Sequence, residues 1–314
     1  MKNMKAIRVH SYGGPEVLKL DEVPVPVPAA DEVLIRVIAA AVNPLDCKIR
    51  SGQMREMMPL ELPYVAGGDG SGIVEAVGAE VTKFQPGNAV FAFLEVGRSG
   101  SFAEYFTIKA AHVAHKPRTV SFIEAAALPM ISQTAWLAMI KVGEIAEGQR
   151  VLIHGASGGV GSMAVQLAKW RGAYVIGTGS GSSRTMAESL GVDEFIDYRT
   201  TAFADVVSNV DVVLDTLGGT TQEASWGVLR PGGLLIATAQ PPSPERAKAA
   251  GVRATFIHTP PSGEVLEQIA ALVDTGKLRA PVGAEFSLAE AVRAHELMES
   301  GRSSGKIVLY VGKP

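Results

Sequence analysis

A glycine-rich turn is the part of the chain whose residue types and spacing most clearly indicate chemistry. Residues 154–184 read HGASGGVGSMAVQLAKWRGAYVIGTGSGSSR, with an A-x-G-x-x-G form of the dinucleotide fingerprint at 156–161. Backbone N–H groups at the start of a helix, together with the helix dipole, favour a pyrophosphate. A tight strand-to-helix turn without a ligand is the alternative. The residues predicted to hold the pyrophosphate are Ser157, Gly158, Gly159, Val160 and Gly161.

Two of these glycines have separate roles in the prediction. Gly158 would let the backbone approach the phosphate, and Gly161 would let the helix pack close to the preceding strand. The turn also lies between an apolar strand and an amphipathic helix, which is the context that this motif requires.

The loop after the next strand indicates which dinucleotide binds. NAD sites usually carry an Asp or Glu about 20 residues further on, where it binds the ribose 2′-OH. Residues 177–184 read GTGSGSSR and contain no carboxylate. Ser180 and Arg184 can bond a 2′-phosphate instead. We therefore predict NADP(H), with a solvated surface charge as the alternative for Arg184. The residues predicted around the adenosine end are Gly179, Ser180, Arg184 and Tyr198.

Alternating strands and helices position this turn. RVLIHGA is typical of a buried parallel strand and SMAVQLAKWRG of a helix that ends at Gly172, and further strands follow at YVIGTG, EFIDY, VDVVLDTLG and GGLLIATA. Ser121 with Glu124 forms a capping-box pattern before the apolar segment SFIEAAALPMISQTAWLAMI, which predicts a helix there. This order predicts an α/β fold with a doubly wound parallel sheet.

The two ends of the chain have a different pattern. Residues 1 to about 120 contain strand-like segments separated by turn signals, which predicts a β-rich unit. The last segments include a helix capped by Ser287 and Glu290 and a strand, GKIVLYV. These segments lie outside the βαβ run, and we expect them to return to the first domain.

Composition excludes several classes of protein. Hydrophobic residues make up 47% of the 314 residues and charged residues 19%, which is ordinary for a globular enzyme. A net charge of −3 gives no indication of a nucleic-acid or membrane-surface partner. We find no secretory signal and no run of 18 apolar residues. Cys47 is the only cysteine, which excludes an intrachain disulfide and fits a cytoplasmic protein.

The chain resembles the medium-chain dehydrogenase/reductases, in their zinc-independent quinone oxidoreductase branch. The resemblance covers nearly the whole length, through GGPEVLKL, AAAVNPLDCKIRSG, GGDGSGIVEAVG, GSFAEYFTIKA, AAALPMISQTAW, HGASGGVGSMAVQLAKWRGA, LDTLGG and SGKIVLY. It implies a GroES-like β-rich catalytic domain formed by residues 1–121 and 256–314. A Rossmann NADP-binding domain would occupy residues 122–255. The resemblance also implies a homodimer, formed through a strand after the nucleotide-binding sheet.

The zinc ligands of the related alcohol dehydrogenases are missing. Asn43-Pro44-Leu45-Asp46 and Gly67-Gly68-Asp69 occupy the corresponding positions, and the four-cysteine structural lobe is absent. A catalytic zinc needs three protein ligands, and Asn43 and Gly68 do not supply them. We therefore predict no metal site.

Without a Lewis acid, hydride transfer to an electron-poor acceptor remains feasible. Quinones and α,β-unsaturated carbonyls are small-molecule electrophiles of this kind. By resemblance, Asn43 and Asp46 line the catalytic cleft. Lys48 occupies a position that is often Tyr and could donate a proton, with a plain surface lysine as the alternative.

Further cofactor contacts are implied by the resemblance. Thr134 matches a residue that binds the nicotinamide carboxamide, Lys306 is often near the cofactor, and the remaining residues end strands or form a wall beside the nicotinamide: Thr238, Ala239, Phe256, Ile257 and His258. Helix back-bonding is the alternative for Thr134, core or dimer packing for Phe256, and a solvated surface position for Lys306.

Two other functions remain open. An enoyl-thioester reductase would use the same chemistry, but its substrate needs a basic groove, and we find no Lys/Arg cluster in the first domain. A non-catalytic NADPH-binding protein is the second alternative, because a fold alone does not guarantee chemistry.

Overall fold

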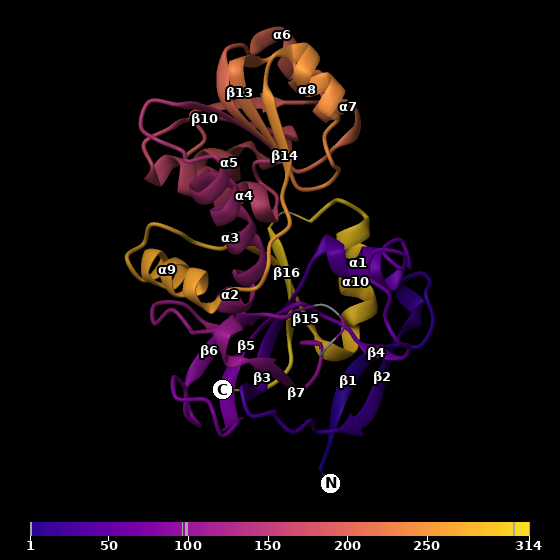
Figure 1. Ribbon diagram of the computed structural model, residues 1–314. Helices are drawn as coiled ribbons and strands as arrows, with labels where there is room; N and C mark the ends of the chain where they lie inside the picture. The colour runs from indigo at the N-terminus through magenta and orange to yellow at the C-terminus, as the bar shows by residue number, and fades with distance from the viewer. Residues whose placement is uncertain (1, 96, 98–99, 304, 314) are drawn as a thin grey trace. The chain divides into compact units, whose positions relative to one another are not determined.

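The computed structural model describes residues 2–95, 97, 100–303 and 305–313 (Figure 1). The chain forms two compact units. Unit 1 contains residues 1–130, 260–276 and 280–314, and unit 2 contains residues 131–259 and 277–279. Both are discontinuous in sequence, because unit 2 is inserted into unit 1.

The unit boundaries differ slightly from the sequence estimate of 121/122 and 255/256. Helix α2 (Phe122–Ala126) stays in unit 1, because Ala126 is buried together with Ala39 and Ala41 of strand β3 (Glu32–Val42). Residues 256–259 stay in unit 2, where the Ile257 N–H donates to the carbonyl of Ala237 at 3.0 Å.

Unit 2 is built on a parallel sheet. Its strands are β9 (Arg150–His154), β10 (Tyr174–Gly179), β11 (Glu194–Asp197), β12 (Val210–Asp215), β13 (Leu229–Ala237) and β14 (Arg253–Phe256). Their order in the sheet is β11-β10-β9-β12-β13-β14, and every neighbouring pair is parallel. The chain direction across the sheet reverses between β9 and β12, and ligands of such sheets bind at the carboxyl ends of the strands near that point.

Helices connect these strands. They are α4 (Gly159–Trp170), α5 (Arg184–Ser189), α6 (Phe203–Val206), α7 (Gly219–Ser225) and α8 (Pro244–Ala250), with a 3₁₀ turn, η4 (Gly181–Ser183), before α5. Gly172 has a φ of 83° after α4, so it ends the helix in the left-handed region as a glycine can. The prediction of a doubly wound α/β unit is confirmed.

The sequence pattern predicted a helix throughout the apolar segment after Ser121. The structure instead divides this segment into two α-helices and a π-helical segment. The capping box is present, since the Ser121 N–H donates to the Glu124 carboxylate at 2.8 Å. However, α2 ends at Ala126 and α3 (Pro129–Trp136) begins at the proline, followed by a π-helical segment, η3 (Leu137–Val142). Pro129 has no N–H to continue the preceding helix, but it is well suited to start the next one.

Unit 1 contains two sheets within its described residues. The smaller has the order β2-β1-β4, from β1 (Asn3–Val9), β2 (Leu18–Pro24) and β4 (Tyr64–Val65). The larger has the order β15-β16-β3-β5-β6-β8, with β7 also on β3, from β5 (Asp69–Val77), β6 (Ala89–Phe93), β7 (Tyr105–Lys109), β8 (Val113–His115), β15 (Val282–Ser287) and β16 (Lys306–Tyr310).

Strand β16, near the C-terminal end of the sequence, pairs with strand β3 from the N-terminal part. It pairs antiparallel with β3, with Val308 opposite Ala41 (Figure 1). Val33, Val37 and Leu309 contribute to one apolar core under this sheet.

The helices of unit 1 are α1 (Pro44–Arg50), α2, α9 (Gly263–Asp274) and α10 (Ala291–Glu299), with 3₁₀ turns η1 (Pro15–Val17), η2 (Ala110–His112) and η5 (Leu288–Glu290). No helix among the described residues is both long and apolar enough to cross a bilayer.

Candidate functional site

The glycine-rich turn has the geometry that a pyrophosphate site needs. A Cβ on Gly161 would lie 2.0 Å from the carbonyl oxygen of Gly155, so only glycine allows α4 to pack this close to the end of β9. A Cβ on Gly158, the N-cap of α4, would meet only the Gly155 oxygen, at 3.2 Å. The turn is therefore tightly packed behind Gly161 and open around Gly158. These residues fit a dinucleotide phosphate.

A buried histidine, His154, lies directly before this turn and contacts two neighbouring elements. His154 Nε2 lies 2.9 Å from Ser225 Oγ, and its Nδ1 lies 3.0 Å from Thr178 Oγ1. Ser225 Oγ donates to the Thr221 carbonyl oxygen at 2.7 Å, so it accepts the hydrogen from Nε2. Burial lowers the pKa of His154 to about 4, partly opposed by the charge of Asp215. A neutral imidazole thus links β9, β10 and α7.

The residues predicted for the adenosine end gather at one edge of the sheet. Gly179 ends β10, and the Tyr198 N–H donates to its carbonyl oxygen at 3.1 Å. Arg184 starts α5, where its guanidinium packs 4.8 Å from the ring centre of Phe195 and lies 3.3 Å from the Glu188 carboxylate. Both members of that ion pair are about half exposed, so Arg184 remains accessible to a phosphate.

The structure also brings an acid to this edge that the sequence pattern missed. Asp197, at the end of β11, has Oδ2 only 2.5 Å from where a Cβ of Gly181 would stand. Its other oxygen accepts a hydrogen bond from the Arg199 N–H at 3.0 Å. The loop 177–184 has no carboxylate of its own, but its neighbouring strand supplies one. This charge acts against a 2′-phosphate, whereas Arg184 acts for it.

The remaining predicted cofactor residues of unit 2 lie at strand ends, in α3 and around the glycine-rich turn. The Thr238 N–H donates to the Asp215 carbonyl oxygen at 3.0 Å, directly after β13, and Ala239 follows. Phe256 ends β14 and is 43% exposed, while Ile257 is buried and His258 exposed. Thr134 is buried in α3. Ser157, Gly159 and Val160 lie in the turn and the first turn of α4.

Asp215 has a structural task. Its Oδ1 accepts from the N–H groups of Leu217 and Gly218, at 3.0 and 2.9 Å, and its Oδ2 accepts from Gln222 Nε2 at 2.9 Å. The carboxylate therefore holds the loop after β12, and it is fully buried.

Unit 1 contains a buried polar cluster centred on Asn43. Its Oδ1 accepts from Lys306 Nζ at 2.5 Å, and its Nδ2 donates to Asp69 Oδ2 at 3.0 Å. Its backbone N–H donates to Asp46 Oδ2 at 2.7 Å. Asn43, Asp46, Asp69 and Lys306 (hereafter the Asn43 cluster) are each no more than 8% exposed.

Local sequence explains how α1 presents this cluster. Asn43 is the N-cap, Pro44 occupies the first turn, and Asp46 at the third position returns a hydrogen bond to the cap. Asp69 is the first residue of β5, where its Oδ1 accepts the Met130 N–H at 2.9 Å. Lys306 is the first residue of β16 and also donates to the Val42 carbonyl oxygen at 3.1 Å.

Burial dominates the electrostatics of the cluster. It raises the pKa of Asp46 to about 7; the Asn43 N–H opposes this rise, the Asp69 charge adds to it and Lys306 opposes it. Burial also raises the pKa of Asp69 and lowers that of Lys306, and each of these two charges opposes the effect on the other. The Lys306 Nζ to Asp69 Oδ2 distance is 3.7 Å.

Two neighbouring residues on α1 are outside this cluster. Lys48 is exposed, and no described residue forms a hydrogen bond or ion pair with its side chain. Cys47 is buried, with Sγ 3.4 Å from His295 Nδ1 on α10. Burial raises the pKa of the Cys47 thiol to about 12, so the thiolate is scarce at neutral pH.

The residues at the positions of the zinc ligands of related alcohol dehydrogenases do not fit a metal. The described residues contain no group of three His, Cys, Asp or Glu that could hold an ion. In the Asn43 cluster, the Asn43 oxygen already binds the Lys306 ammonium, and both Asp69 oxygens accept hydrogen bonds. The Lys306 ammonium, a cation that belongs to the chain itself, therefore already lies beside Asn43.

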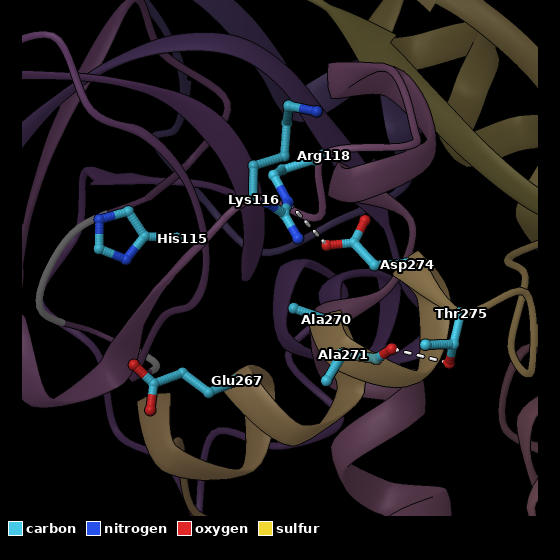
Figure 2. A pocket seen from close by; sticks show the side chains of 8 residues that line it. All are labelled: His115, Lys116, Arg118, Glu267, Ala270, Ala271, Asp274 and Thr275. Atoms are coloured by element: carbon cyan, nitrogen blue, oxygen red, sulfur yellow. Dashed lines mark hydrogen bonds and ion pairs between the residues drawn. The ribbon is translucent and has the colours of Figure 1, made fainter.

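A surface pocket elsewhere on unit 1 contains none of the predicted site residues (Figure 2). It lies between α9 and the segment that follows β8. The side chains labelled there include Arg118 and Asp274, which form an ion pair at 3.6 Å. Glu267 pairs with Lys83 at 2.6 Å. We assign no chemistry to this pocket.

Family models match two regions of the chain. The alcohol dehydrogenase GroES-like domain matches residues 29–118, and the zinc-binding dehydrogenase model matches residues 190–309. Pig quinone oxidoreductase is 35% identical over 99% of this chain and 98% of its own length. Tomato 2-methylene-furan-3-one reductase is 35% identical over 98% of this chain and 79% of its own length.

Solved structures give the same result. The quinone oxidoreductase from Coxiella burnetii has a TM-score of 0.92 and 33% identity, covering 99% of this chain and all of the other. Mycobacterial Rv1454c, solved with NADPH, has a TM-score of 0.87 and 33% identity, covering 98% of this chain and 99% of the other. With these matches over nearly its full length, the chain is an oxidoreductase of the medium-chain dehydrogenase/reductase superfamily and belongs to its quinone oxidoreductase branch.

Proposed function

We propose that the protein is an NADPH-dependent, zinc-independent reductase that transfers hydride to quinones or α,β-unsaturated carbonyls. The single observation that carries this proposal is the Asn43 cluster, in which Lys306 occupies the site that a metal would need. Conjugated acceptors spread the developing negative charge, so they need less electrophilic help than an alcohol or a simple carbonyl.

The choice of NADPH over NADH rests on the edge of the unit 2 sheet. Arg184 and Ser180 supply a guanidinium and a hydroxyl for a 2′-phosphate, and the Rv1454c structure contains NADPH. Asp197 opposes this preference, so selectivity depends on the balance between the two charges. NADPH, when bound, supplies the hydride; the chain binds and orients it.

The enoyl-thioester alternative is less well supported. Its phosphate-bearing arm needs free basic residues on unit 1. Arg50 is 1% exposed and pairs with Glu299, so it is not available to such an arm.

We also propose a homodimer in a reducing, cytoplasmic setting. Strand β14 is the last strand of its sheet and pairs only with β13 among the described strands, which leaves an edge that a second copy could extend. Phe256 exposes an aromatic ring beside that edge. Cys47, a free thiol, fits a reducing compartment.

The test is an NADPH-oxidation screen with quinones, 2-alkenals, 2-alkenones, crotonyl-CoA and simple alcohols, with metal content measured on the same sample. We expect turnover of quinones or enones by protein that contains no stoichiometric zinc. Turnover of crotonyl-CoA alone would favour the thioester reductase. NADPH binding without any turnover would favour the non-catalytic alternative.

A further inference from the structure

One carboxylate oxygen of Asp46, Oδ1, accepts no backbone N–H of the described residues. Its Oδ2 accepts the Asn43 N–H, and the Asn43 side chain also interacts with this carboxyl group. Oδ1 lies 3.8 Å from where a Cβ of Gly68 would stand, next to Met130 Cε and Phe93 Cε2, which lie 3.5 and 3.9 Å from the same point. Asp46 is only 8% exposed. A carboxylate oxygen thus lies beside a largely apolar space, about the size of a methyl group, next to Gly68.

The charges around Asn43 do not balance. Two carboxyl groups, Asp46 and Asp69, share one ammonium, Lys306, so full ionisation would leave a net negative charge in a dry environment. One retained proton removes this excess.

Hydrogen bonding decides which carboxyl group keeps the proton. Asp69 accepts from Asn43 Nδ2 and the Met130 N–H, and lies 3.7 Å from the Lys306 ammonium. Asp46 accepts one backbone N–H, that of Asn43, and is also stabilised by the Asn43 side chain. Since donors and a nearby cation stabilise the ionised form, this arrangement favours the carboxylate at Asp69 and the acid at Asp46.

We propose that Asp46 is the acid that gives a proton to the reduced substrate, and that Asn43, Asp69 and Lys306 are positioning residues that hold its carboxyl group in place. This inference rests on the proposed function, and it assigns to Asp46 the proton transfer that sequence reasoning gave to Lys48. Lys48 is exposed on the same helix and takes no part in the cluster.

The proton and electrons balance with NADPH as the reductant. An enone receives a hydride at its β-carbon, the C=C π bond breaks, and the electron pair moves to the oxygen as an enolate. The α-carbon of the enolate forms a C–H bond with the proton of the Asp46 O–H group, whose bonding electrons stay on the carboxylate, and the C=O bond forms again. Water then returns a proton to Asp46. The sum is enone, NADPH and one proton giving saturated ketone and NADP⁺.

The neighbours of Asp46 give this step its pH dependence. The titratable groups that interact with its charge come from several elements: Asp69 of β5, Lys306 of β16, Tyr64 of β4 and Cys47 of α1. On α10, which packs against α1, His295 and Glu299 lie next to Cys47 and Arg50. Burial raises the pKa of Asp46 to about 7, so the acid is half protonated near neutral pH.

The experiment compares wild type with Asp46→Asn, which keeps an oxygen to accept the Asn43 N–H. Asp21→Asn is the matched control, because Asp21 lies on the surface with His10 and Arg8. Single-turnover reduction of a quinone and an enone is followed from pH 5.5 to 9, with NADPH affinity measured by fluorescence. Separately, protein labelled with ¹³C at the aspartate carboxyls is titrated by NMR, and D46N assigns the Asp46 signal.

We expect wild-type rates to fall above pH 7. D46N should lose about 100-fold or more in rate and lose that pH dependence, with NADPH affinity unchanged. The Asp46 signal should titrate near pH 7. A D46N rate within threefold of wild type, or an Asp46 signal that titrates below pH 5, would overturn the inference. If wild type reduces nothing, the proposed function fails, whereas the NMR titration still decides whether Asp46 holds the proton.

Misfolding of D46N is checked by circular dichroism and by its NADPH affinity. Lys306→Arg provides a second variant, since it keeps the charge but changes the geometry around Asn43. We expect it to shift the pH midpoint of the rate. An unchanged midpoint would remove Lys306 from the positioning role.

Discussion

Asn43 and Lys306, 263 positions apart in the chain, are joined by a hydrogen bond of 2.5 Å from the ammonium to the amide oxygen. This bond fixes the orientation of the Asn43 amide, because only its NH₂ group can then donate to Asp69. The amide links the ammonium, the carboxylate of β5 and the start of α1 in one connected set. The candidate site of unit 1 therefore has a defined geometry before any substrate binds.

Removing the buried ammonium should destabilise the protein strongly. In Lys306→Met, Asp69 loses its cation while it remains fully buried, and we expect a loss of about 3–5 kcal/mol in the free energy of unfolding at pH 7.5. The control is Lys83→Met, which breaks a half-exposed pair with Glu267 and should cost about 1 kcal/mol or less. Urea denaturation compares the two. Equal losses would mean that the buried pair is not structurally important.

Asp46→Asn should stabilise the protein at alkaline pH. The pKa of Asp46 is about 7 in the folded protein against 3.8 for a free side chain, so ionisation disfavours folding increasingly as pH rises from about 4 to 7. The neutral amide of D46N removes this cost, and we expect a gain of roughly 3 kcal/mol at pH 8 that disappears by about pH 4.5. Urea denaturation at both pH values measures it. A gain that is equal at both values would contradict the pKa assignment.

His154 has the opposite pH dependence. Its pKa is about 4 in the folded protein against 6.5 for a free side chain, so its contribution is complete above pH 6.5 and declines as the pH falls toward 4. In His154→Phe, the hydroxyls of Thr178 and Ser225 lose their shared partner. We expect a loss of about 2–4 kcal/mol at pH 7.5. The difference from wild type should shrink at pH 5, and a constant difference would exclude the neutral imidazole.

Arg184 and Asp197 should control the choice of coenzyme in opposite directions. Arg184→Ala should weaken NADPH binding about 10-fold and leave NADH binding unchanged. Asp197→Asn should strengthen NADPH binding, because it removes a negative charge beside Gly181. Calorimetric titration with both coenzymes measures the effects. Equal changes for NADPH and NADH would show that neither residue contacts the 2′-phosphate.

Cys47 should be unreactive in the folded protein. It is buried, and burial raises its pKa to about 12, so a thiol reagent at pH 8 finds little thiolate. We expect labelling at least 100-fold slower than in urea-unfolded protein, where the thiol has its ordinary pKa. Because Cys47 is the only cysteine, absorbance with a disulfide reagent reports it directly. Rapid labelling of folded protein would contradict the packing against His295.

Local signals predicted unit 2 well. Strand β10 has the bounds of the YVIGTG segment, and α4 follows the glycine-rich turn, because short-range patterns determine such βαβ units. Both capping boxes are present, at Ser121 and at Ser287. The break at Pro129 was available in the sequence, since proline starts helices more readily than it continues them.

Contacts between distant segments could not be predicted. Asp197 reaches Gly181 because β11 lies next to β10, which local composition does not encode. Similarly, the resemblance to relatives indicates Asn43 and Lys306 separately and gives no sign that they touch. The sequence distinguishes Asp69 only by its place at a position that corresponds to a zinc ligand of the related alcohol dehydrogenases. A charged residue at the start of an apolar strand, as at Asp69 and Lys306, is the signal that could have indicated a buried partner for each.

The pairing of β16 with β3 makes unit 1 depend on two segments that lie far apart in the sequence. The lysine that neutralises Asp69 is carried by β16, so loss of that strand leaves a buried carboxylate uncompensated and the edge of β3 uncovered. A variant truncated before Lys306 should therefore fail to complete the larger sheet of unit 1, whereas unit 2 has a sheet of its own.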